Sequence, residues 1–428
     1  MTTPPSTNSK TPADQTALWI GLDWGDRQHN FALLDDAGQG QEGQLEHTSE
    51  KLHAWLQSLG ERAGGRPVRL ALETSHGAVV AALLEYPWLE IYPINPITSA
   101  NYRKAFRPSG AKDDLPDARV LLALVRQHAD QLRPLQVQDG PTQKLAGLVA
   151  ARRGIVDRRT AVLNQLTSLL KGYFPQALAL LENLDTDLAL ALLRRWPDLL
   201  ALKTARSATL KRFFHQHQVR SETLIRERLE AIAAARALTT DLERIAVAVL
   251  QLHPLLDQLE VLRRHVEIFN HEIKAAFAAH PEAALFRNLP GAGPQLAPRL
   301  CAAFGTVRSL YPDPASLQKY AGVAPVREKS GKQCWTHWRW QAPTFLRQSF
   351  VEWAGQTVRY SAWAGKYYEH MRKKGKGHAV ILRALAFKWI RILWRCWQDR
   401  VAYDETRYLQ QLQHRKSPYA IITTIEKS

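Results

Sequence analysis

Cysteine is scarce in this chain of 428 residues, which has only Cys301, Cys334 and Cys396, widely spaced. That spacing excludes a disulfide-stapled scaffold and a CxxC-type zinc site, and it suits a reducing compartment. No run of about 18 uncharged apolar residues occurs, so we expect no membrane span. Residues 1–16 have no apolar core, which indicates a loose polar tail and not a signal peptide. We therefore expect a cytoplasmic protein.

Acidic residues are also scarce in one part of the chain. Residues 285–400 contain 20 Lys+Arg and 5 Asp+Glu, and hence nearly all of the total net charge of +17. The same segment contains eight of the 13 tryptophans. Cations interleaved with aromatic residues are typical of nucleic-acid-binding surfaces. A plainer interpretation is a solvated basic face over a tryptophan-rich core. We favour nucleic acid because such a patch repels itself without a polyanionic partner.

The length predicts two or three domains of roughly 100–200 residues each. Residues 17–140 follow the pattern of an α/β domain. The expected strands are two within 17–35, joined by a turn at Gly25–Asp26, and one each at 68–73 and 89–94. The expected helices are 77–86 and 116–129.

Residues 141–284 are rich in Leu, Ala and Arg, and their apolar residues recur every three to four positions. This periodicity predicts long helices, which we expect Pro175, Pro197 and Pro254 to break. The region is either a helical bundle within one monomer or a coiled-coil arm for dimerisation, and we favour the arm. Residues 285–400 form a third, basic and mostly helical region. A tail follows at 401–428, expected to be loose from about Ser417.

Four carboxylates form a candidate site in the first region. Asp23 and Glu73 each end an apolar strand, and Asp114 and Asp117 lie three residues apart in KDDLPDARVL, on one face of the expected helix. Gathered carboxylates repel unless a divalent cation neutralises them, and Mg²⁺ suits oxygen ligands and phosphate chemistry. Each acid alone is equally compatible with a turn or a cap, and Asp113 is an alternative to Asp114.

The basic region has two motifs suited to phosphate. LPGAGPQLA (289–297) has the form of a helix–hairpin–helix turn, in which Gly291 and Gly293 allow backbone N–H groups to face a phosphate. Ser330 lies in REKSGK among cations, and on these residues alone it is a phosphate-contacting serine of a loop. As a nucleophile it would need a base or a metal, and His337 is nearby. The residues expected to contact nucleic acid are Gly291, Gly293, Arg327, Lys329, Lys332, Arg339, Arg372, Lys373, Lys374 and Lys376.

These motifs together resemble a known family. Asp23, Glu73 and the K-x-D-x-x-D-A element at 112–118 resemble the amino-terminal RuvC-like domain of the insertion-sequence-110 family of transposases. LPGAGPQLA, YAGVAP (320–325) and Ser330–Gly331 resemble its carboxy-terminal transposase domain. The resemblance extends over about residues 17–400. It departs from the family at Asp113, Leu115 and Pro116, and in the tryptophan-rich stretch after Ser330, where more Arg and Gly would be expected.

The resemblance implies an architecture and a mechanism. The fold would be a RuvC-like (RNase H-like) α/β domain, a long coiled-coil middle and a mostly helical transposase domain with a helix–hairpin–helix-like element. Asp23, Glu73, Asp114 and Asp117 would bind Mg²⁺, and Ser330 would attack a DNA phosphodiester to form a covalent phosphoserine.

The resemblance also implies partners. These are donor and target DNA, a structured noncoding bridge RNA that pairs with both, and other copies of the chain in a dimer or, as a dimer of dimers, a tetramer. The setting would be the bacterial cytoplasm, in association with the nucleoid.

Two other functions remain open. One is a Mg²⁺-dependent structure-specific nuclease of the Holliday-junction resolvase type, and the other is a non-catalytic nucleic-acid-binding protein. A hydrolytic nuclease needs only acids, metal and water, whereas a covalent serine intermediate conserves the energy of the phosphodiester. Finding both motifs in one chain therefore favours a recombinase.

Overall fold

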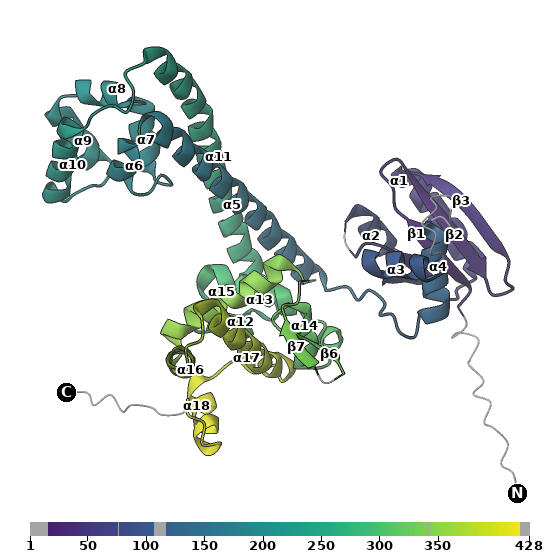
Figure 1. The fold of residues 1–428 in the computed structure, drawn as a ribbon. Coiled ribbons are helices and arrows are strands. Elements are labelled where there is room, and N and C mark those ends of the chain that lie inside the picture. The colour runs from purple at the N-terminus through teal and green to yellow at the C-terminus, as the bar shows by residue number, and fades with distance from the viewer. Residues whose placement is uncertain (1–15, 76, 107–116, 332, 341, 420–428) are drawn as a thin grey trace, which may run out of the picture. The chain divides into compact units, whose positions relative to one another are not determined.

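The computed structural model describes residues 16–75, 77–106, 117–331, 333–340 and 342–419. The chain divides between Val137 and Gln138 into two compact units (Figure 1). The first unit is mixed α/β and the second is almost entirely helical, in agreement with the predicted fold class at that level. The finer division into a coiled-coil region, a transposase domain and a tail stays a prediction.

The first unit is built on a five-stranded sheet of order β3-β2-β1-β4-β5. β1 is antiparallel to β2 and parallel to β4, and β4 is parallel to β5. The strands are β1 (Leu18–Asp23), β2 (Gln28–Asp35), β3 (Gly40–Glu46), β4 (Val68–Leu72) and β5 (Leu89–Pro93). All four predicted strands are confirmed. β3 was missed because its sequence, GQEGQLE, is polar and buries only Leu45.

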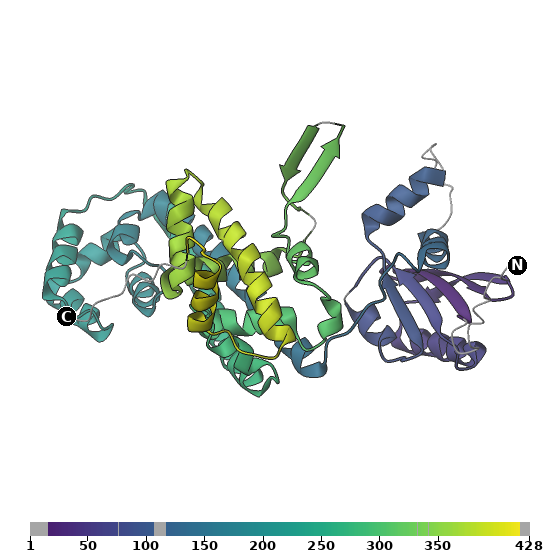
Figure 2. The same ribbon diagram turned by 90° about the horizontal axis from the view of Figure 1, so that it is seen from below.

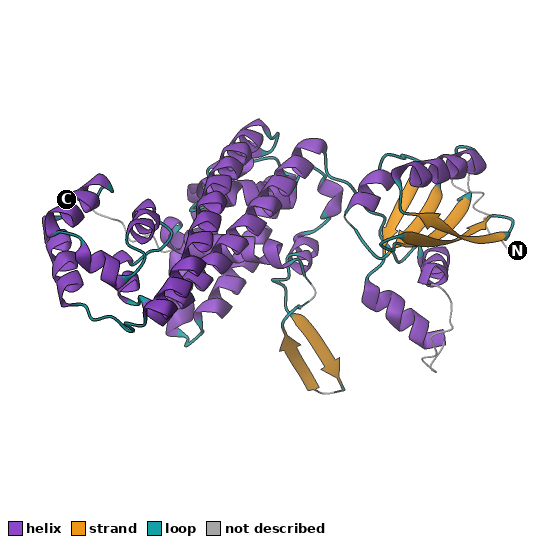
Figure 3. Cartoon of the chain, turned by 90° about the horizontal axis from the view of Figure 1, so that it is seen from above, coloured by secondary structure: helices purple, strands orange, loops and turns teal. Residues whose placement is uncertain are grey.

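Helices cover both faces of this sheet (Figure 3). The helices are α1 (Ser49–Ala63), α2 (Ala78–Leu83), α3 (Pro96–Phe106) and α4 (Asp117–His128). α1 and α2 pack with Ile20 and Leu70 in one core, whereas α4 packs with Ala71 and Tyr92 in another. The predicted helices α2 and α4 are confirmed, and α1 and α3 were missed.

The second unit begins with two long helices, α5 (Gly140–Tyr173) and α11 (Leu242–Ala279), which lie side by side (Figure 1). They are antiparallel, because Leu145 near the start of α5 packs with Ile273 near the end of α11. The expectation of long helices is confirmed. The pairing joins two segments of one chain and leaves open whether the region also dimerises.

Prolines end helices in this region at two of the three expected positions. Pro175 caps the start of α6 (Gln176–Leu181), and Pro197 separates α7 (Asp187–Arg195) from α8 (Leu199–Thr204). The prediction was wrong for Pro254, which lies inside the continuous helix α11. Pro254 and Leu250, the residue one turn earlier, are exposed, so water can bond the carbonyl that loses its partner.

A small group of helices, called the head here, connects the end of α5 to the start of α11. It consists of α6, α7 and α8 together with α9 (Ser207–Gln216) and α10 (Glu222–Ala234). Its core contains Trp196, Phe213 and Phe214, and it continues into Leu166 of α5 and Leu256 of α11. The head is therefore packed onto the paired helices.

The remaining elements surround a second core at the other end of the pair. They are α12 (Ala283–Arg287), α13 (Gly293–Phe304), the 3-10 turn Arg308–Leu310, α14 (Pro314–Tyr320), β6 (Val326–Ser330), β7 (Gln333–His337), α15 (Thr344–Tyr360), α16 (Ala362–Lys373), α17 (His378–Gln398) and α18 (Glu405–His414). Most of this region is helical. β6 and β7 form a hairpin that projects from the helices of its own unit (Figure 2).

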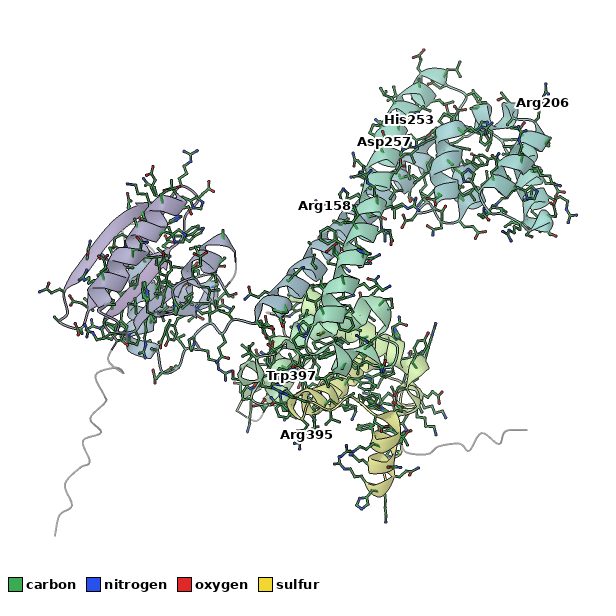
Figure 4. All side chains as sticks on the ribbon, turned by 180° about the vertical axis from the view of Figure 1, so that it is seen from behind. Arg158, Arg206, His253, Asp257, Arg395 and Trp397 are labelled. Carbon is green, nitrogen blue, oxygen red and sulfur yellow. The ribbon has the colours of Figure 1, made fainter. Side chains whose placement is uncertain are left out.

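Four of the eight tryptophans in the basic segment are core residues. Trp353, Trp363, Trp389 and Trp397 are at most 1% exposed. Each indole N–H has a partner: Trp389 donates to Thr357 Oγ1 at 2.8 Å, and Trp397, labelled in Figure 4, donates to the Gly305 carbonyl at 2.8 Å. For these four residues the plainer interpretation, a tryptophan-rich core beneath a basic surface, is the correct one.

Candidate active site and nucleic-acid interface

Asp23 and Glu73 lie at the same edge of the α/β sheet. β1 and β4 are parallel neighbours, and Gly21 pairs with Ala71, so each acid follows the same pair by two residues. Adjacent strands are about 4.8 Å apart. Asp23 is half-buried and Glu73 is exposed. The two carboxylates are therefore neighbours at the carboxyl ends of β1 and β4.

Helix α4 brings Asp117 to the same region. α4 crosses β1 so closely that a Cβ at Gly21 would lie 1.9 Å from the Ala118 carbonyl oxygen. Asp117, the first residue of α4, directly precedes Ala118. Only glycine allows this approach of helix to strand. The sequence feature that positions Asp117 is therefore a glycine two residues before Asp23.

Helix α3 holds two of the acids. The Ser99 hydroxyl donates to Glu73, and the Arg103 guanidinium pairs with Asp117. Ser99 and Arg103 are four residues apart, so they are neighbours on one face of α3. Glu73 and Asp117 are thus held about one helical turn apart. Sequence reasoning missed α3 and both partners, although Asn95–Pro96 is a helix-start signal: Asn95 Oδ1 accepts from the Ile97 N–H at 2.9 Å.

A buried histidine supports the turn after Asp23. His29 has no exposed surface, stacks on Trp24 with ring centroids 3.6 Å apart, and accepts the Gly25 N–H at Nδ1 at 3.2 Å. Its proton must then lie on Nε2, from which it donates to His47 Nδ1 at 3.1 Å. Burial and His47 lower the pKa of His29. The neutral ring is therefore a structural support, and the sequence pattern did not indicate it.

The metal site itself stays a prediction. Asp114, its alternative Asp113 and Lys112 lie outside the described residues. Within the described ranges, no three His, Cys, Asp or Glu side chains are grouped closely enough to hold a metal ion. Arg103 and Ser99 are the partners of Asp117 and Glu73 here. The donor set fits Mg²⁺ chemically, because all its members are carboxylates, and one of them, Asp117, pairs with a cation here, the Arg103 guanidinium.

Ser330 lies at the tip of the β6–β7 hairpin and not in an irregular loop. It is exposed, pairs with Gln333, and is followed by Gly331 at φ +57°. Alternation along β6 places Ser330 on the face opposite to Arg327 and Lys329. These exposed cations therefore flank Ser330 along the strand without sharing its face. Lys332 lies outside the described residues.

A Glu–His pair shares the Ser330 face of the hairpin. Glu328 accepts from His337 Nε2 at 2.6 Å and from the Trp335 indole at 2.8 Å. The hydrogen bond with Glu328 raises the pKa of His337 and lowers that of Glu328. His337 pairs with Val326, four residues before Ser330, so about 13 Å of strand separates His337 from Ser330. Within this hairpin His337 is too distant to be the base for Ser330.

The glycine turn predicted to be part of a helix–hairpin–helix element lies between α12 and α13. Gly291 and Gly293 have φ of +69° and +54°. A Cβ at Gly291 would lie 2.8 Å from the Tyr360 ring, and the neighbouring Pro290 carbonyl accepts the Trp353 indole N–H at 3.0 Å. The turn is therefore anchored on α15.

The other predicted cations end α16 or follow it. Arg372, Lys373, Lys374 and Lys376 are all exposed, around Gly375 at φ +74°. Arg339 is half-buried and donates to the Ala324 carbonyl at 3.4 Å. The cluster 372–376 is thus an exposed cationic surface, whereas Arg339 helps to hold the base of the hairpin.

A carboxylate-lined sheet edge and a strongly basic helical region in one chain are typical of enzymes that act on nucleic-acid phosphates. Comparison with known proteins defines the enzyme further. A transposase family named for its DEDD acids and for IS110 matches residues 20–175. A second model, described as the transposase IS116/IS110/IS902 family, matches residues 283–369.

Curated relatives match almost the whole chain. A Streptomyces coelicolor protein assigned as the mini-circle transposase for IS117 is 29% identical over 92% of this chain and 97% of its own length. Proteins of insertion elements IS116 of Streptomyces clavuligerus and IS900 of Mycobacterium paratuberculosis are 26% and 25% identical, each over 90% of this chain. The chain belongs to the IS110 family of transposases. It is accordingly a DNA transposase, and DNA is its partner.

Proposed function

We propose that this transposase cuts and rejoins DNA strands with a Mg²⁺-dependent acidic site and a serine nucleophile. The observation that supports the proposal is the position of three acids, from three elements, around the carboxyl ends of β1 and β4. Asp23 ends β1 and Glu73 directly follows the neighbouring β4, and Ser99 and Arg103, one turn apart on α3, contact Glu73 and Asp117. Asp114 stays the fourth proposed ligand. The strand order β3-β2-β1-β4-β5 supports a RuvC-like description of this unit.

The proposed reaction is a transesterification at phosphorus. The Ser330 hydroxyl loses its proton as its oxygen bonds to phosphorus, and the bond to the leaving nucleotide oxygen breaks as that oxygen is protonated. The number of phosphodiester-type bonds is unchanged, so rejoining needs no external energy source. Bound Mg²⁺ would neutralise negative charge at the attacked phosphate. Exposure of Ser330 at a hairpin tip gives a DNA strand access to its hydroxyl.

Trapping of the covalent intermediate tests this mechanism. Wild-type protein with Mg²⁺ and DNA carrying the element's ends should yield a protein–DNA adduct that survives denaturation. Ser330→Ala and Asp23→Asn should each abolish the adduct, and EDTA should prevent its formation until Mg²⁺ is restored. If Ser330→Ala still cuts DNA in a Mg²⁺-dependent reaction, the chain is a hydrolytic nuclease of the Holliday-junction resolvase type and the serine mechanism is wrong.

A structured noncoding RNA is part of the proposal, because base pairing would supply sequence choice while Lys and Arg side chains hold the backbones. The exposed cations at 372–376 suit this role. Purification of the protein from its host and sequencing of the bound RNA tests it. Recovery of one abundant transcript encoded beside the element supports RNA guidance. Recovery of no RNA from active protein contradicts it. The proposed setting is the nucleoid in the bacterial cytoplasm.

Self-association is proposed to involve α11. Its exposed apolar residues Val247, Val261 and Ile268 lie at multiples of seven residues, and Leu250 is 74% exposed. By length and composition α11 could also cross a membrane, although one such helix is weak evidence, and only 22% of its most apolar stretch is buried in the chain. A seven-residue apolar repeat is typical of a coiled-coil seam, which a second copy can cover by two-fold symmetry.

A groove beside this stripe is lined by Arg158 of α5 and Asp257 of α11, which lie along the paired helices in Figure 4. Leu250→Lys combined with Val261→Lys should lower the mass measured by light scattering. The matched control is Gln251→Lys, which changes an exposed polar residue of the same helix. An unchanged mass for the double variant would exclude this surface as the interface.

A further inference from the structure

A group of aromatic and cationic residues lies where β7 leaves the hairpin and rejoins the helices. Trp340 is 77% exposed, and its ring centroid is 6.4 Å from that of the half-buried Trp338, with the two planes tilted by 56°. An indole exposed to this extent is uncommon beside a core that buries four other tryptophans. Neither ring belongs to that core. Trp340 therefore offers a free aromatic face to a ligand.

Two arginines lie over Trp338. The guanidinium carbon of Arg383, on α17, is 3.9 Å from the ring centroid, and that of Arg347, on α15, is 4.9 Å away. Stacking fixes the planes of both guanidinium groups. Arg347 also donates to the Arg339 carbonyl at 3.1 Å, which joins α15 to the base of the hairpin. The tryptophans and arginines are thus a single built cluster, positioned by three separate elements.

The charge of this cluster is not balanced within the described part of the chain. Burial lowers the pKa of Arg383, and the positive charge of Arg347 lowers it further. Glu328 of β6 and Glu352 of α15, acids of the adjoining elements, pair instead with His337 and Arg299 respectively. Two neighbouring guanidinium groups repel unless an anion accepts hydrogen bonds from both. Phosphate has the charge and the oxygen atoms for this role.

We propose that Trp338, Trp340, Arg347 and Arg383 form a platform for an unpaired nucleotide. The base stacks on the free face of Trp340, and its phosphate lies against Arg347 and Arg383. A paired base cannot reach an indole face, because its own faces are covered by neighbours in the duplex. The platform therefore distinguishes single-stranded from double-stranded nucleic acid. The inference deepens the proposed function, since the platform continues directly from the strand paired with the one that ends in Ser330.

Binding measurements with matched oligonucleotides test the platform. The probes are one sequence prepared as single-stranded DNA, as single-stranded RNA and as fully paired DNA duplex, with the full chain in EDTA. Trp340→Ala should weaken single-strand binding about 5- to 150-fold, the range expected for loss of one base–aromatic stack. Duplex binding should change less than twofold. Trp340→Phe should retain most of the single-strand affinity, because it keeps an aromatic face.

Arginine variants test the phosphate contact. Arg383→Gln should reduce the slope of log K against log salt by about 0.7 on a single strand, the value for one lost phosphate contact. Arg395→Gln is the matched control, since Arg395 is on the same helix but pairs with Asp399 at 2.6 Å; its slope should be unchanged. Thermal melting of each variant checks folding independently.

Each outcome of these binding measurements either supports or overturns the platform. Loss on either single strand with the duplex unaffected supports the platform, and the strand that responds identifies DNA or RNA as the source of the nucleotide. No loss on either strand, equal loss on strand and duplex, or equal loss in Trp340→Phe and Trp340→Ala overturns it. Binding in EDTA involves no strand cleavage. A failed adduct test at Ser330 would therefore leave the evidence for the platform unchanged. Likewise, unchanged single-strand binding in Trp340→Ala would leave the serine mechanism unaffected.

Discussion

Replacement of Gly21 by alanine should disable the acidic site without altering any acid. The new Cβ would lie 1.9 Å from the Ala118 carbonyl oxygen and 2.4 Å from the Leu122 backbone nitrogen, whereas real Cβ atoms essentially never come within 3.0 Å of a non-bonded heavy atom. Both atoms are backbone, so α4 as a whole must move by at least about 1 Å. Overpacking of this kind typically costs about 1–3 kcal/mol. Asp117 must move with α4.

Two readouts follow from this displacement. Amide hydrogen exchange of α4 should become about 5- to 150-fold faster for protons that exchange through opening of the α/β unit, as a cost of about 1–3 kcal/mol implies. Strand transfer should fall about 100-fold, the loss typical of a catalytic group misplaced by 1 Å. DNA binding through the basic region should be unaffected.

The matched control is Gly40→Ala in β3. A Cβ there meets its nearest neighbour, Leu34 Cδ1, at an ordinary 3.6 Å, so both readouts should match wild type. If Gly21→Ala shows wild-type amide exchange in α4, then α4 does not lie on β1 as described. If it shows wild-type strand transfer, then the position of Asp117 is unimportant. Either result would refute the argument for a site at this sheet edge.

Three further predictions concern the basic region. The pKa of His337 is raised above its ordinary value of 6.5, and the pKa of Glu328 is lowered. Both groups should therefore be charged near pH 6, where the ion pair is complete. The pair should be lost as pH rises through the pKa of His337, which then loses its charge, and as pH falls through the pKa of Glu328, which is then protonated. In an NMR titration Glu328→Gln should bring the pKa of His337 down towards 6.5, and an unchanged value would exclude the pair. Trp389→Ala should lower the free energy of unfolding by about 3–5 kcal/mol because it empties a fully buried site, whereas Trp340→Ala should change it by less than about 0.5 kcal/mol. The logarithm of the DNA-binding constant should fall steeply and linearly with the logarithm of the salt concentration. A slope near zero would contradict binding through contacts with the phosphate backbone.

The strands that carry the acids can be predicted from the sequence, because each is a nearly continuous run of apolar residues. LWIGLD and VRLAL each bury most of their residues between helices on both faces of the sheet. A strand buried in this way needs apolar residues almost throughout, so its end is marked by the first carboxylate. The apolar pattern alone therefore places Asp23 and Glu73 at strand ends.

The partners of these acids are not readable in the same way. α3 has a weak amphipathic pattern, and its contacts depend on Ser99 and Arg103 meeting residues 26 and 14 positions away. The same applies to Pro254, whose effect depends on which side of α11 faces water. It applies equally to tryptophan, because the indole is large and apolar yet suits both a core and a binding surface.

The sequence by itself determined the class of this protein: a basic carboxy-terminal region, acids after buried strands, and a serine beside a turn glycine in the motif order of one transposase family. These are properties of local composition and spacing, which the chain carries whether or not it is folded. Only the tertiary structure decided that α3 supports two of the acids, that four tryptophans are buried while Trp340 is free, and that Ser330 stands at a hairpin tip. Such facts depend on contacts between distant segments, which no local pattern records.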